Sequence, residues 1–421
     1  MPDPATSSAP DALPTDGVLR PRAGDPGRAD AYLPAPAVQN HAANLAELPG
    51  GDLGCVWFGG TQEGVSDIGV WFSRLPRGAD TWTEPVALSD DRTRSEQNPV
   101  LFAPPSGGLW LLWTAQRAGH QDTSEVRRRI SADGGRTWGA VETLFPARPT
   151  SGVFIRQPVT VLDSGRWLLP VFHCVSVPGR AWVGDRDTSA VMVSDDQGAT
   201  WRERPVPDST GCVHMNIQAL ADGTLLALFR SRWADHVHRS HSTDGGETWS
   251  APVPTALPNN NSSIQFVRLR DDRLALVYNA SSAADATERR VSLYDEIDDD
   301  GLAPSTPGAG APAPEAPTGA GEPGREGERT AFWGAPRAPM TLAVSADGGA
   351  TWPLRHDLEV GDGYCLTNNS RDGLNREFSY PSILQNADGG LDVAFTYYRQ
   401  AIKHVRLSPE WLAARAAEAG A

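Results

Sequence analysis

An eight-residue motif, Ser-x-Asp-x-Gly-x-Thr-Trp, occurs four times in this chain and constrains its fold more than any other feature. The copies are SADGGRTW at 131–138, SDDQGATW at 194–201, STDGGETW at 242–249 and SADGGATW at 345–352, and an incomplete fifth copy, SRLPRGADTW, ends at Trp82. Recurrence at intervals of tens of residues is typical of repeat architectures. Each copy predicts a turn in which Ser and Asp bond backbone amides, Gly takes a positive φ and Trp packs between sheets.

Six segments between these motifs share an apolar stretch, a turn that carries Asp, Ser or Gly, and a second apolar stretch. They are NLAELPGGDLGCVWF, NPVLFAPPSGGLWLLW, QPVTVLDSGRWLLPVF, NIQALADGTLLALF, SIQFVRLRDDRLALVYN and YPSILQNADGGLDVAFTYY. Each segment predicts a β-hairpin. Five of the hairpins are followed by a third strand and a Trp-containing turn. The pattern therefore predicts an all-β fold, a six-bladed β-propeller whose last blade closes with a strand from the other end of the chain.

Composition divides the chain into a propeller and less regular segments. Residues 1–36 are rich in Pro, Ala, Asp and Gly without periodicity, which predicts a disordered N-terminal tail. We expect the propeller to cover residues 37–407, with a low-complexity insertion at 301–329. The insertion explains why successive motif tryptophans stand 56, 63 and 48 residues apart but the last two stand 103 apart. Residues 408–421 form a C-terminal tail, SPEWLAARAAEAGA from Ser408, in which we expect a short helix.

The bulk composition excludes several classes of partner. A formal net charge of −15 argues against binding to nucleic acid or to an anionic membrane surface. No apolar run approaches the roughly 18 residues of a membrane-spanning helix. The four cysteines are scattered without metal-ligand spacing, so we expect free thiols, no metal and no cofactor. The N-terminus lacks the pattern of a secretory signal, and we expect a cytoplasmic protein.

The repeated motif is the Asp-box, and Asp-boxes in a six-bladed propeller resemble the sialidase (neuraminidase) superfamily over about residues 37–407. The resemblance implies an enzyme that removes a terminal sugar bearing a carboxylate. In the superfamily three arginines hold the carboxylate, a Tyr backed by a Glu attacks the anomeric carbon, and an Asp is the acid/base. A neutral phenol suits this attack because the anionic substrate does not repel it.

Several residues of the superfamily have counterparts here. The second and third arginines match Arg230 in LFRSR and Arg337 in PRAPM, the nucleophile matches Tyr380 in REFSYPS, and the acidic loop contains Glu63 and Asp67 in GGTQEGVSDIG. Two positions depart from the pattern, because His41 stands where the first arginine is expected and His214 where the glutamate is expected. These departures leave open whether sialic acid is the substrate.

The register of the hairpins predicts which side chains share the pocket. In a propeller the inner strands begin at the mouth of the central channel, and polar side chains there converge. His41, Asn98, Arg156, His214 and Tyr380 lie at or just before the start of a hairpin, and Arg230 and Asn279 lie at the end of one. Each residue also fits a structural role, in a core hydrogen bond, an ion pair or a solvated loop.

We assign provisional roles to these residues from their chemistry. The expected catalytic residues are Tyr380, Glu63 or Asp67 as general acid, and His41 as a base that titrates near neutral pH. The expected substrate-binding residues are Arg156, Arg230 and Arg337, which can clamp a carboxylate, together with Asn98, His214, Asn279 and Glu377.

Three functions compete on this evidence. The first is a sialidase-like exo-glycoside hydrolase acting on a terminal, carboxylate-bearing sugar or sugar-like small molecule. The second is a lyase that cleaves uronate-containing glycans, with His and Tyr as base and acid. The third is a non-catalytic glycan-binding propeller, because fold alone does not imply function. In all three the partner is a small molecule or glycan, and the first two require an acidic group on it.

Overall fold

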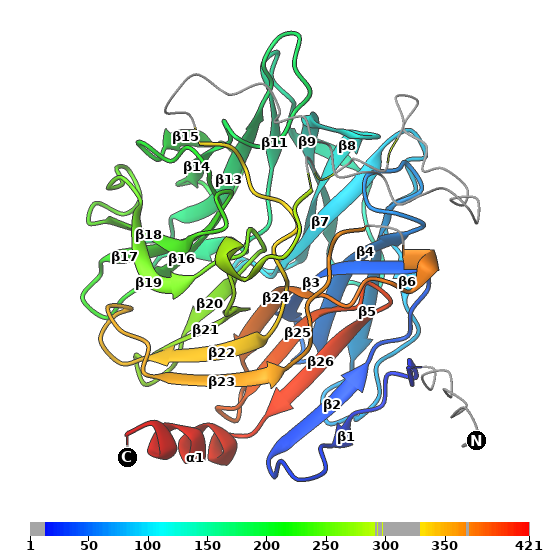
Figure 1. Cartoon of the computed structure of the whole chain (residues 1–421), viewed down its shortest axis with the longest axis vertical. Coiled ribbons are helices and arrows are strands. Elements are labelled where there is room, and N and C mark those ends of the chain that lie inside the picture. The colour runs from blue at the N-terminus through cyan, green and yellow to red at the C-terminus, as the bar shows by residue number, and fades with distance from the viewer. Residues whose placement is uncertain (1–12, 291–292, 294–296, 298–328, 368–369, 421) are drawn as a thin grey trace, which may run out of the picture.

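The computed structural model describes residues 13–290, 293, 297, 329–367 and 370–420 (Figure 1). These residues form six antiparallel sheets of four or five strands, and the predicted six-bladed β-propeller is confirmed. Blade 1 consists of β3 (Gln39–Glu47), β4 (Leu53–Gly60), β5 (Gly69–Leu75) and β6 (Val86–Ala87). Blade 2 consists of β7 (Ser95–Phe102), β8 (Leu109–Arg117), β9 (His120–Ser131) and β10 (Glu142–Phe145).

The next three blades follow the same order from the inner to the outer strand. Blade 3 contains β11 (Ser151–Phe154), β12 (Thr160–Val161), β13 (Trp167–Val175), β14 (Thr188–Ser194) and β15 (Arg202–Pro205). Blade 4 contains β16 (Cys212–Ala219), β17 (Leu225–Ser231), β18 (His236–Ser242) and β19 (Val253–Pro258). Blade 5 contains β20 (Gln265–Arg268), β21 (Leu274–Asn279), β22 (Met340–Ser345) and β23 (Leu354–Glu359).

The sixth blade joins the two ends of the chain. It combines β24 (Phe378–Gln385), β25 (Leu391–Tyr397) and β26 (Ala401–Leu407) with β2 (Arg28–Tyr32) and β1 (Arg20–Pro21) from the N-terminal segment. The predicted closing strand is therefore present, but it lies inside the segment 1–36 that we expected to be disordered. Pairing with β26 supplies the backbone hydrogen bonds that the short segment could not form alone, and the buried Lys403 ammonium binds Asp30 across that pair.

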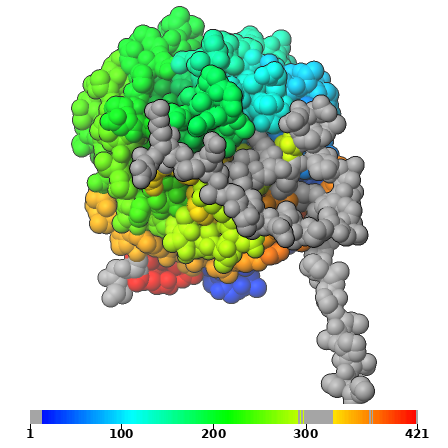
Figure 2. Space-filling model, turned by 45° about the horizontal axis from the view of Figure 1, so that its top comes forward, coloured from blue at the N-terminus to red at the C-terminus, as the bar shows by residue number. Residues whose placement is uncertain are grey.

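The C-terminal segment packs against the N-terminal one. Helix α1 (Pro409–Gly420) follows β26, and its Trp411 packs against Gly27 and donates a hydrogen bond to Asp25. The helix and the N-terminal strands lie together at one edge of the molecule (Figure 2). The predicted insertion at 301–329 lies outside the described residues except for Arg329. Within the described part of the chain, no helix is long and apolar enough to cross a membrane.

Each repeated Ser-x-Asp-x-Gly-x-Thr-Trp motif connects the third strand of a blade to the fourth. In the copy at 242–249 the Ser242 hydroxyl accepts the amide of Gly246 at 2.9 Å, and Asp244 accepts both the amide and the hydroxyl of Thr248. Gly246 has a φ of 85°. The other three copies have the same bonds, so the motif specifies a turn by satisfying its own backbone.

The antiparallel order of strands places these turns and the predicted site at opposite ends of the propeller. The turns between first and second strands and between third and fourth strands share one end. The starts of the inner strands, the ends of the second strands and the connections to the third strands share the other. His41 and Tyr380 belong to inner strands, Arg230 to the end of β17 and Glu63 to the connection after β4, so all four lie at this second end.

Side chains of the inner strands bond neighbouring blades to one another. Asn44 accepts the amide of Leu101 in blade 2 at 2.9 Å. Asn216 does the same for Phe266 in blade 5 at 2.7 Å. Gln265 accepts the amide of Ile383 in blade 6, and the Ser382 hydroxyl accepts the amide of Leu45 in blade 1. Because these amides are buried, each bond prevents a desolvated donor from remaining unsatisfied.

We expect Asn216→Ala to lower the free energy of unfolding by about 1–3 kcal/mol, because the buried amide of Phe266 loses its acceptor. Urea denaturation followed by tryptophan fluorescence would measure the change. Asn386→Ala is a matched control, since this half-buried turn residue bonds Asp392 within its own blade. Equal losses in the two variants would contradict the structural importance of the bond between blades.

Candidate active site

A bulge at the same place in four inner strands directs side chains toward the centre of the propeller. The register shifts occur between His41 and Asn44, Gln97 and Val100, Val213 and Asn216, and Ser379 and Ser382. In each bulge one residue has a positive φ, namely Ala42, Asn98, His214 and Tyr380 at 63°, 49°, 53° and 52°. Positive φ is uncommon for residues other than glycine and marks strained, often functional positions. In blade 1 the position equivalent to His214 and Tyr380 is Ala42, and His41 lies one residue before it.

Tyr380 is the centre of the resulting cluster. Arg230 Nη1 donates to the Tyr380 hydroxyl at 2.6 Å. The guanidinium carbons of Arg156, Arg230 and Arg337 lie 5.4, 5.7 and 5.7 Å from the centroid of the Tyr380 ring. The His41 ring centroid is 4.4 Å away. The structure therefore brings together five of the predicted residues. They are His41 from blade 1, Arg156 from blade 3, Arg230 from blade 4, Arg337 from blade 5 and Tyr380 from blade 6.

Two neutral imidazoles flank the Tyr380 ring. Burial lowers the pKa of His41 well below its usual value, and the charge of Arg399 lowers it further. Burial also lowers the pKa of His214, as does the charge of Arg230. His214 Nε2 faces Arg230 Nη1 at 3.5 Å, so it is an acceptor. Both histidines are consequently uncharged at neutral pH, and the expectation that His41 titrates near neutral pH is wrong, because burial and the nearby arginine charges disfavour its protonated form.

Four buried charges form an ion network beside His41. Arg399 Nη1 binds Glu63 Oε2 at 2.6 Å, and Arg399 Nε binds Glu377 Oε1 at 2.9 Å. Arg337 Nη1 binds the other oxygen of Glu377 at 3.1 Å. Burial opposes ionisation of Glu377, but the charges of Arg337 and Arg399 hold its pKa below the usual value. Two cations and two carboxylates balance, so the network carries no net charge.

Arg230 has no carboxylate partner among the described residues. Its Nε donates to Asn261 Oδ1 at 2.7 Å and its Nη1 to the Tyr380 hydroxyl. Burial lowers the pKa of Arg230 to about 10, which leaves the side chain charged at neutral pH. An uncompensated guanidinium beside a cavity is an attractive site for an anionic group of a ligand.

A very small cavity of about 10 Å³, with room for at most one water molecule, adjoins Tyr380 and Arg230. Glu63, Asn98 and His214 also line it, and Glu63 is the only carboxyl group among its described lining residues. Typical ligand sites enclose roughly 300–1,000 Å³. A ligand of sugar size therefore requires the lining side chains to move apart.

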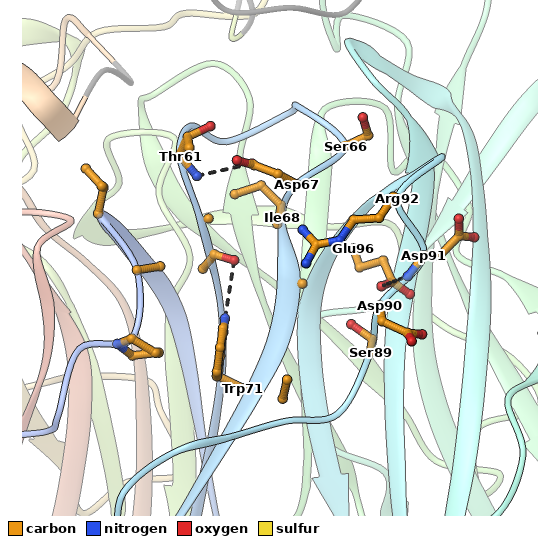
Figure 3. A pocket seen from close by; sticks show the side chains of 17 residues that line it. Thr61, Ser66, Asp67, Ile68, Trp71, Ser89, Asp90, Asp91, Arg92 and Glu96 are labelled. Carbon is orange, nitrogen blue, oxygen red and sulfur yellow. Dashed lines mark hydrogen bonds between the residues drawn. The ribbon is translucent and has the colours of Figure 1, made fainter.

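Asp67 belongs to the same connection as Glu63 but lies in a different pocket. That pocket is lined by Thr61, Asp67 and Trp71, by Asp90 in the connection to blade 2, and by Glu96 of blade 2 (Figure 3). Asp67 Oδ1 accepts the amide of Thr61 at 3.1 Å. The sequence did not distinguish Glu63 from Asp67, whereas the structure places only Glu63 at the cavity beside Tyr380.

Asn279 and Arg156 bond backbone rather than line the cavity. Asn279 Nδ2 donates to the carbonyls of Pro339 and Phe378. Arg156 Nη2 donates to the carbonyls of Ala43, Tyr380 and Pro381. These bonds connect the inner strands behind Tyr380.

The sequence analysis missed two cationic residues of the cluster. Arg399 directly follows the second strand of the sixth hairpin, close to the register that identified Arg230 and Asn279, so the same argument could have found it. Arg232 lies two residues beyond Arg230 and binds the buried Asp187 at 2.7 Å. No sequence signal connects Arg232 with Asp187, because 45 residues separate them.

Nothing in the described part of the chain forms a cluster of three or more His, Cys, Asp or Glu that could hold a metal ion. The four cysteines are buried free thiols.

Comparison with known proteins identifies related folds. The family described as BNR repeat-like domain matches residues 51–393. The anhydrosialidase of Macrobdella decora is 26% identical over 176 residues, which cover 38% of this chain and 22% of that protein. The intramolecular trans-sialidase of Ruminococcus gnavus, solved with oseltamivir carboxylate, has a TM-score of 0.62 at 12% identity, over 95% of this chain and 99% of that one. A Dyadobacter fermentans protein of unknown function has a TM-score of 0.61 at 15% identity, over 91% and 99%.

The lowered pKa of His41 predicts a pH-dependent stability. Below about pH 6.5 the unfolded chain binds a proton at this residue and the folded chain does not, so stability falls as pH falls, by up to about 1.4 kcal/mol per pH unit. We expect His41→Gln to reduce this slope in urea denaturation between pH 7 and pH 5. The same substitution at the exposed His120 is the control, and equal slopes in wild type and His41→Gln would contradict the prediction.

Proposed function

Since the chain belongs to the BNR repeat-like domain family, in the sialidase superfamily, we propose that it is an exo-acting glycoside hydrolase for a terminal sugar that bears a carboxylate. The observation that carries this proposal is the uncompensated Arg230 guanidinium, which donates to the hydroxyl of Tyr380 beside a cavity lined by Glu63. The match to the Macrobdella decora anhydrosialidase spans only 22% of the length of that protein, so its activity is not assigned to this chain.

In the proposed complex the substrate carboxylate binds Arg230, with Arg337 close by, since both guanidinium carbons lie 5.7 Å from the centroid of the Tyr380 ring. Arg337 is held by Glu377 and so keeps a fixed direction. The carboxylate compensates the charge of Arg230, which the protein leaves unbalanced among its described residues. Guanidinium groups suit this role because they bind carboxylates in a planar, two-pronged geometry.

The reaction then needs a nucleophile, a base and an acid. The Tyr380 oxygen forms a bond to the anomeric carbon while the bond to the leaving oxygen breaks. The phenol proton passes to a neutral imidazole. His214 suits this role because it stands where the superfamily has the glutamate that backs the tyrosine. Glu63, in its protonated form, gives its proton to the leaving oxygen. Water then attacks the anomeric carbon with Glu63 as base, the tyrosyl–sugar bond breaks, and the imidazolium returns its proton to the Tyr380 oxygen.

One observation favours elimination as a second candidate. Glu63 is ion-paired with Arg399 and both histidines are neutral, so the resting site holds more proton acceptors than donors. In a uronate lyase a base removes the proton next to the carboxylate, a carbon–carbon double bond forms, and the leaving oxygen departs with a proton from Tyr380. The unsaturated product absorbs in the ultraviolet, whereas a hydrolysis product does not.

A panel of aryl glycosides of carboxylate-bearing sugars, with uncharged sugars as controls, would test the proposed function. We expect turnover of at least one acidic glycoside without ultraviolet absorption from a new double bond. Turnover with that absorption would favour the lyase. Binding of acidic glycosides and uronate oligosaccharides without any turnover would favour the third function, a non-catalytic glycan-binding propeller.

We expect Tyr380→Phe to lower kcat by roughly 10³-fold with the best acidic substrate, because the nucleophilic oxygen is lost. Glu63→Gln is expected to lower kcat by about 10²–10⁴-fold through loss of the acid/base. Asp67→Asn, in the separate pocket, is the matched control and should retain activity. A larger loss in Asp67→Asn than in Glu63→Gln would overturn the assignment of the acid.

We expect Arg230→Gln to raise KM by about 10–100-fold, since one charge-assisted hydrogen bond to the substrate contributes about 1.5–3 kcal/mol. Steady-state kinetics on an acidic glycoside and on its methyl ester separates the charge effect from a structural one. For the wild type, the KM of the methyl ester should be nearly as high as the KM of the acid is for Arg230→Gln.

A further inference from the structure

His41 uses only one of its two ring nitrogens within the described protein. Its side chain is fully buried, and Nδ1 lies 2.9 Å from the hydroxyl oxygen of Thr396, near the end of β25. Nε2 is buried and has no hydrogen-bond partner among the described residues. A neutral imidazole carries one proton, and the hydrogen bond at one nitrogen decides which of the two nitrogens holds it. The partner of Nδ1 therefore determines whether Nε2 is a donor or an acceptor.

The Thr396 hydroxyl satisfies more groups as a donor to His41 than as an acceptor from it. Its oxygen already accepts the backbone amide of Ala42 at 3.0 Å, and its own proton has no other acceptor among the described residues. With the imidazole proton on Nε2, the hydroxyl donates to Nδ1 and only Nε2–H lacks a partner. With the proton on Nδ1, the hydroxyl proton and the Nε2 lone pair both lack one. Because a buried polar group without a partner costs free energy, the first arrangement is favoured.

The carboxylate of Glu377 is the other polar group close to Nδ1, and it is already satisfied. Its Oε1 lies 3.8 Å from His41 Nδ1, which is beyond hydrogen-bonding distance. The same oxygen accepts from Ser379 Oγ at 2.7 Å, from Arg399 Nε at 2.9 Å and from Arg337 Nη1 at 3.3 Å. Glu377 therefore does not hold the imidazole proton on Nδ1.

We propose that Thr396 is a positioning residue whose hydroxyl holds His41 as the neutral tautomer with its proton on Nε2. His41 is then a hydrogen-bond donor at its free nitrogen, and its only lone pair is occupied by Thr396. This role differs from the base that the sequence suggested. The imidazole keeps the donor character of the arginine that the resemblance implies at this position, without its charge. The tautomer follows from these contacts alone, whereas its consequence for catalysis rests on the proposed function.

His214 differs from His41 in the nitrogen that remains an acceptor. Its Nε2 lies 3.5 Å from Arg230 Nη1, and the same Nη1 donates to the Tyr380 hydroxyl at 2.6 Å. A guanidinium only donates, so His214 Nε2 is unprotonated and shares a donor with the phenol oxygen. In the proposed hydrolase His214 therefore takes the phenol proton, and His41 does not.

Neutron diffraction from crystals of the perdeuterated wild-type protein at neutral pH would test the tautomer directly. We expect deuterium on Nε2 of His41 and a Thr396 hydroxyl whose deuterium points at Nδ1. Ordinary X-ray data do not show these atoms, so the neutron map is the decisive observation. Deuterium on Nδ1 of His41, with or without deuterium on Nε2, would overturn the inference.

NMR of variants tests whether Thr396 sets the tautomer. Long-range ¹H–¹⁵N correlation spectra of ¹⁵N-histidine-labelled protein distinguish protonated from unprotonated ring nitrogens. Thr396→Ser keeps the hydroxyl and should keep the His41 proton on Nε2. Thr396→Val removes the hydroxyl and should move at least part of the population to the Nδ1–H tautomer, because the Glu377 carboxylate then attracts a proton on Nδ1.

Thr114→Val is the matched control for this measurement. Thr114 is as buried as Thr396, pairs with the residue that begins the bulge of its own blade, and donates its hydroxyl to the Gln97 carbonyl. The His41 signals of this variant should match those of wild type. An unchanged tautomer in Thr396→Val, or an equal change in Thr114→Val, would overturn the positioning role.

Kinetics with an acidic glycoside connects the tautomer to catalysis. His41→Gln keeps an oxygen that accepts from Thr396 and an N–H donor, whereas His214→Gln loses the proposed proton acceptor. We therefore expect His214→Gln to lower kcat by about 10²–10⁴-fold and His41→Gln to lower it less. An equal or larger loss in His41→Gln would identify His41 as the base and overturn the inference.

Should Thr396→Val fail to fold, the wild-type neutron map and Thr396→Ser still decide the question. A protein that turns over no acidic glycoside but carries the proton on Nε2 of His41 would refute the proposed function and retain the tautomer. A protein that is active with the proton on Nδ1 would retain the function and refute the inference.

Discussion

The hydrogen bonds between inner strands of neighbouring blades are the interaction on which the rest of this structure depends. Each blade is a separate antiparallel sheet, so its ladder bonds hold the blade together but not the ring. Asn44, Asn216, Gln265 and Ser382 instead bond backbone amides of the next inner strand. Three of these four residues end a bulge, where the strand departs from its own ladder and its side chain is free to reach the neighbouring blade.

The same bulges build the candidate site. The residue with positive φ in each bulge points toward the centre of one end of the propeller, where Asn98, His214 and Tyr380 line a common cavity. Such a backbone costs roughly 1–3 kcal/mol at each position and persists only where the surroundings enforce it. Here the bonds between blades enforce it, so the packing of the ring and the direction of the site residues have one physical origin.

Charge balance gives the site its character. The departures from the sialidase pattern at His41 and His214 do not leave the site without cations, because Arg399 enters from blade 6. Arg399 Nε and His41 Nδ1 lie 2.9 and 3.8 Å from the same oxygen of Glu377. A buried cation is thus kept beside the position where the resemblance implies an arginine, but it is delivered by another strand and already neutralised. Arg230 and Arg156 carry charges that no carboxylate among the described residues balances.

The sequence by itself determined the architecture, since the repeated turns satisfy their own backbone bonds and the hairpins alternate in a pattern that only a repeated four-stranded blade explains. It also brought His41, His214, Arg230 and Tyr380 to one end of the ring through strand register, whereas Arg337 was identified only by the resemblance to the sialidase superfamily. Strand register cannot decide contacts between distant segments, and these were decided by the tertiary structure. Residues 28–32 form a strand because β26 offers an unpaired edge, and Glu63 rather than Asp67 faces the cavity. The tertiary structure also decided that Arg399 pairs with Glu63 across 336 residues of chain. These outcomes depend on contacts between distant segments, and no local pattern of residue types encodes which buried charge meets which.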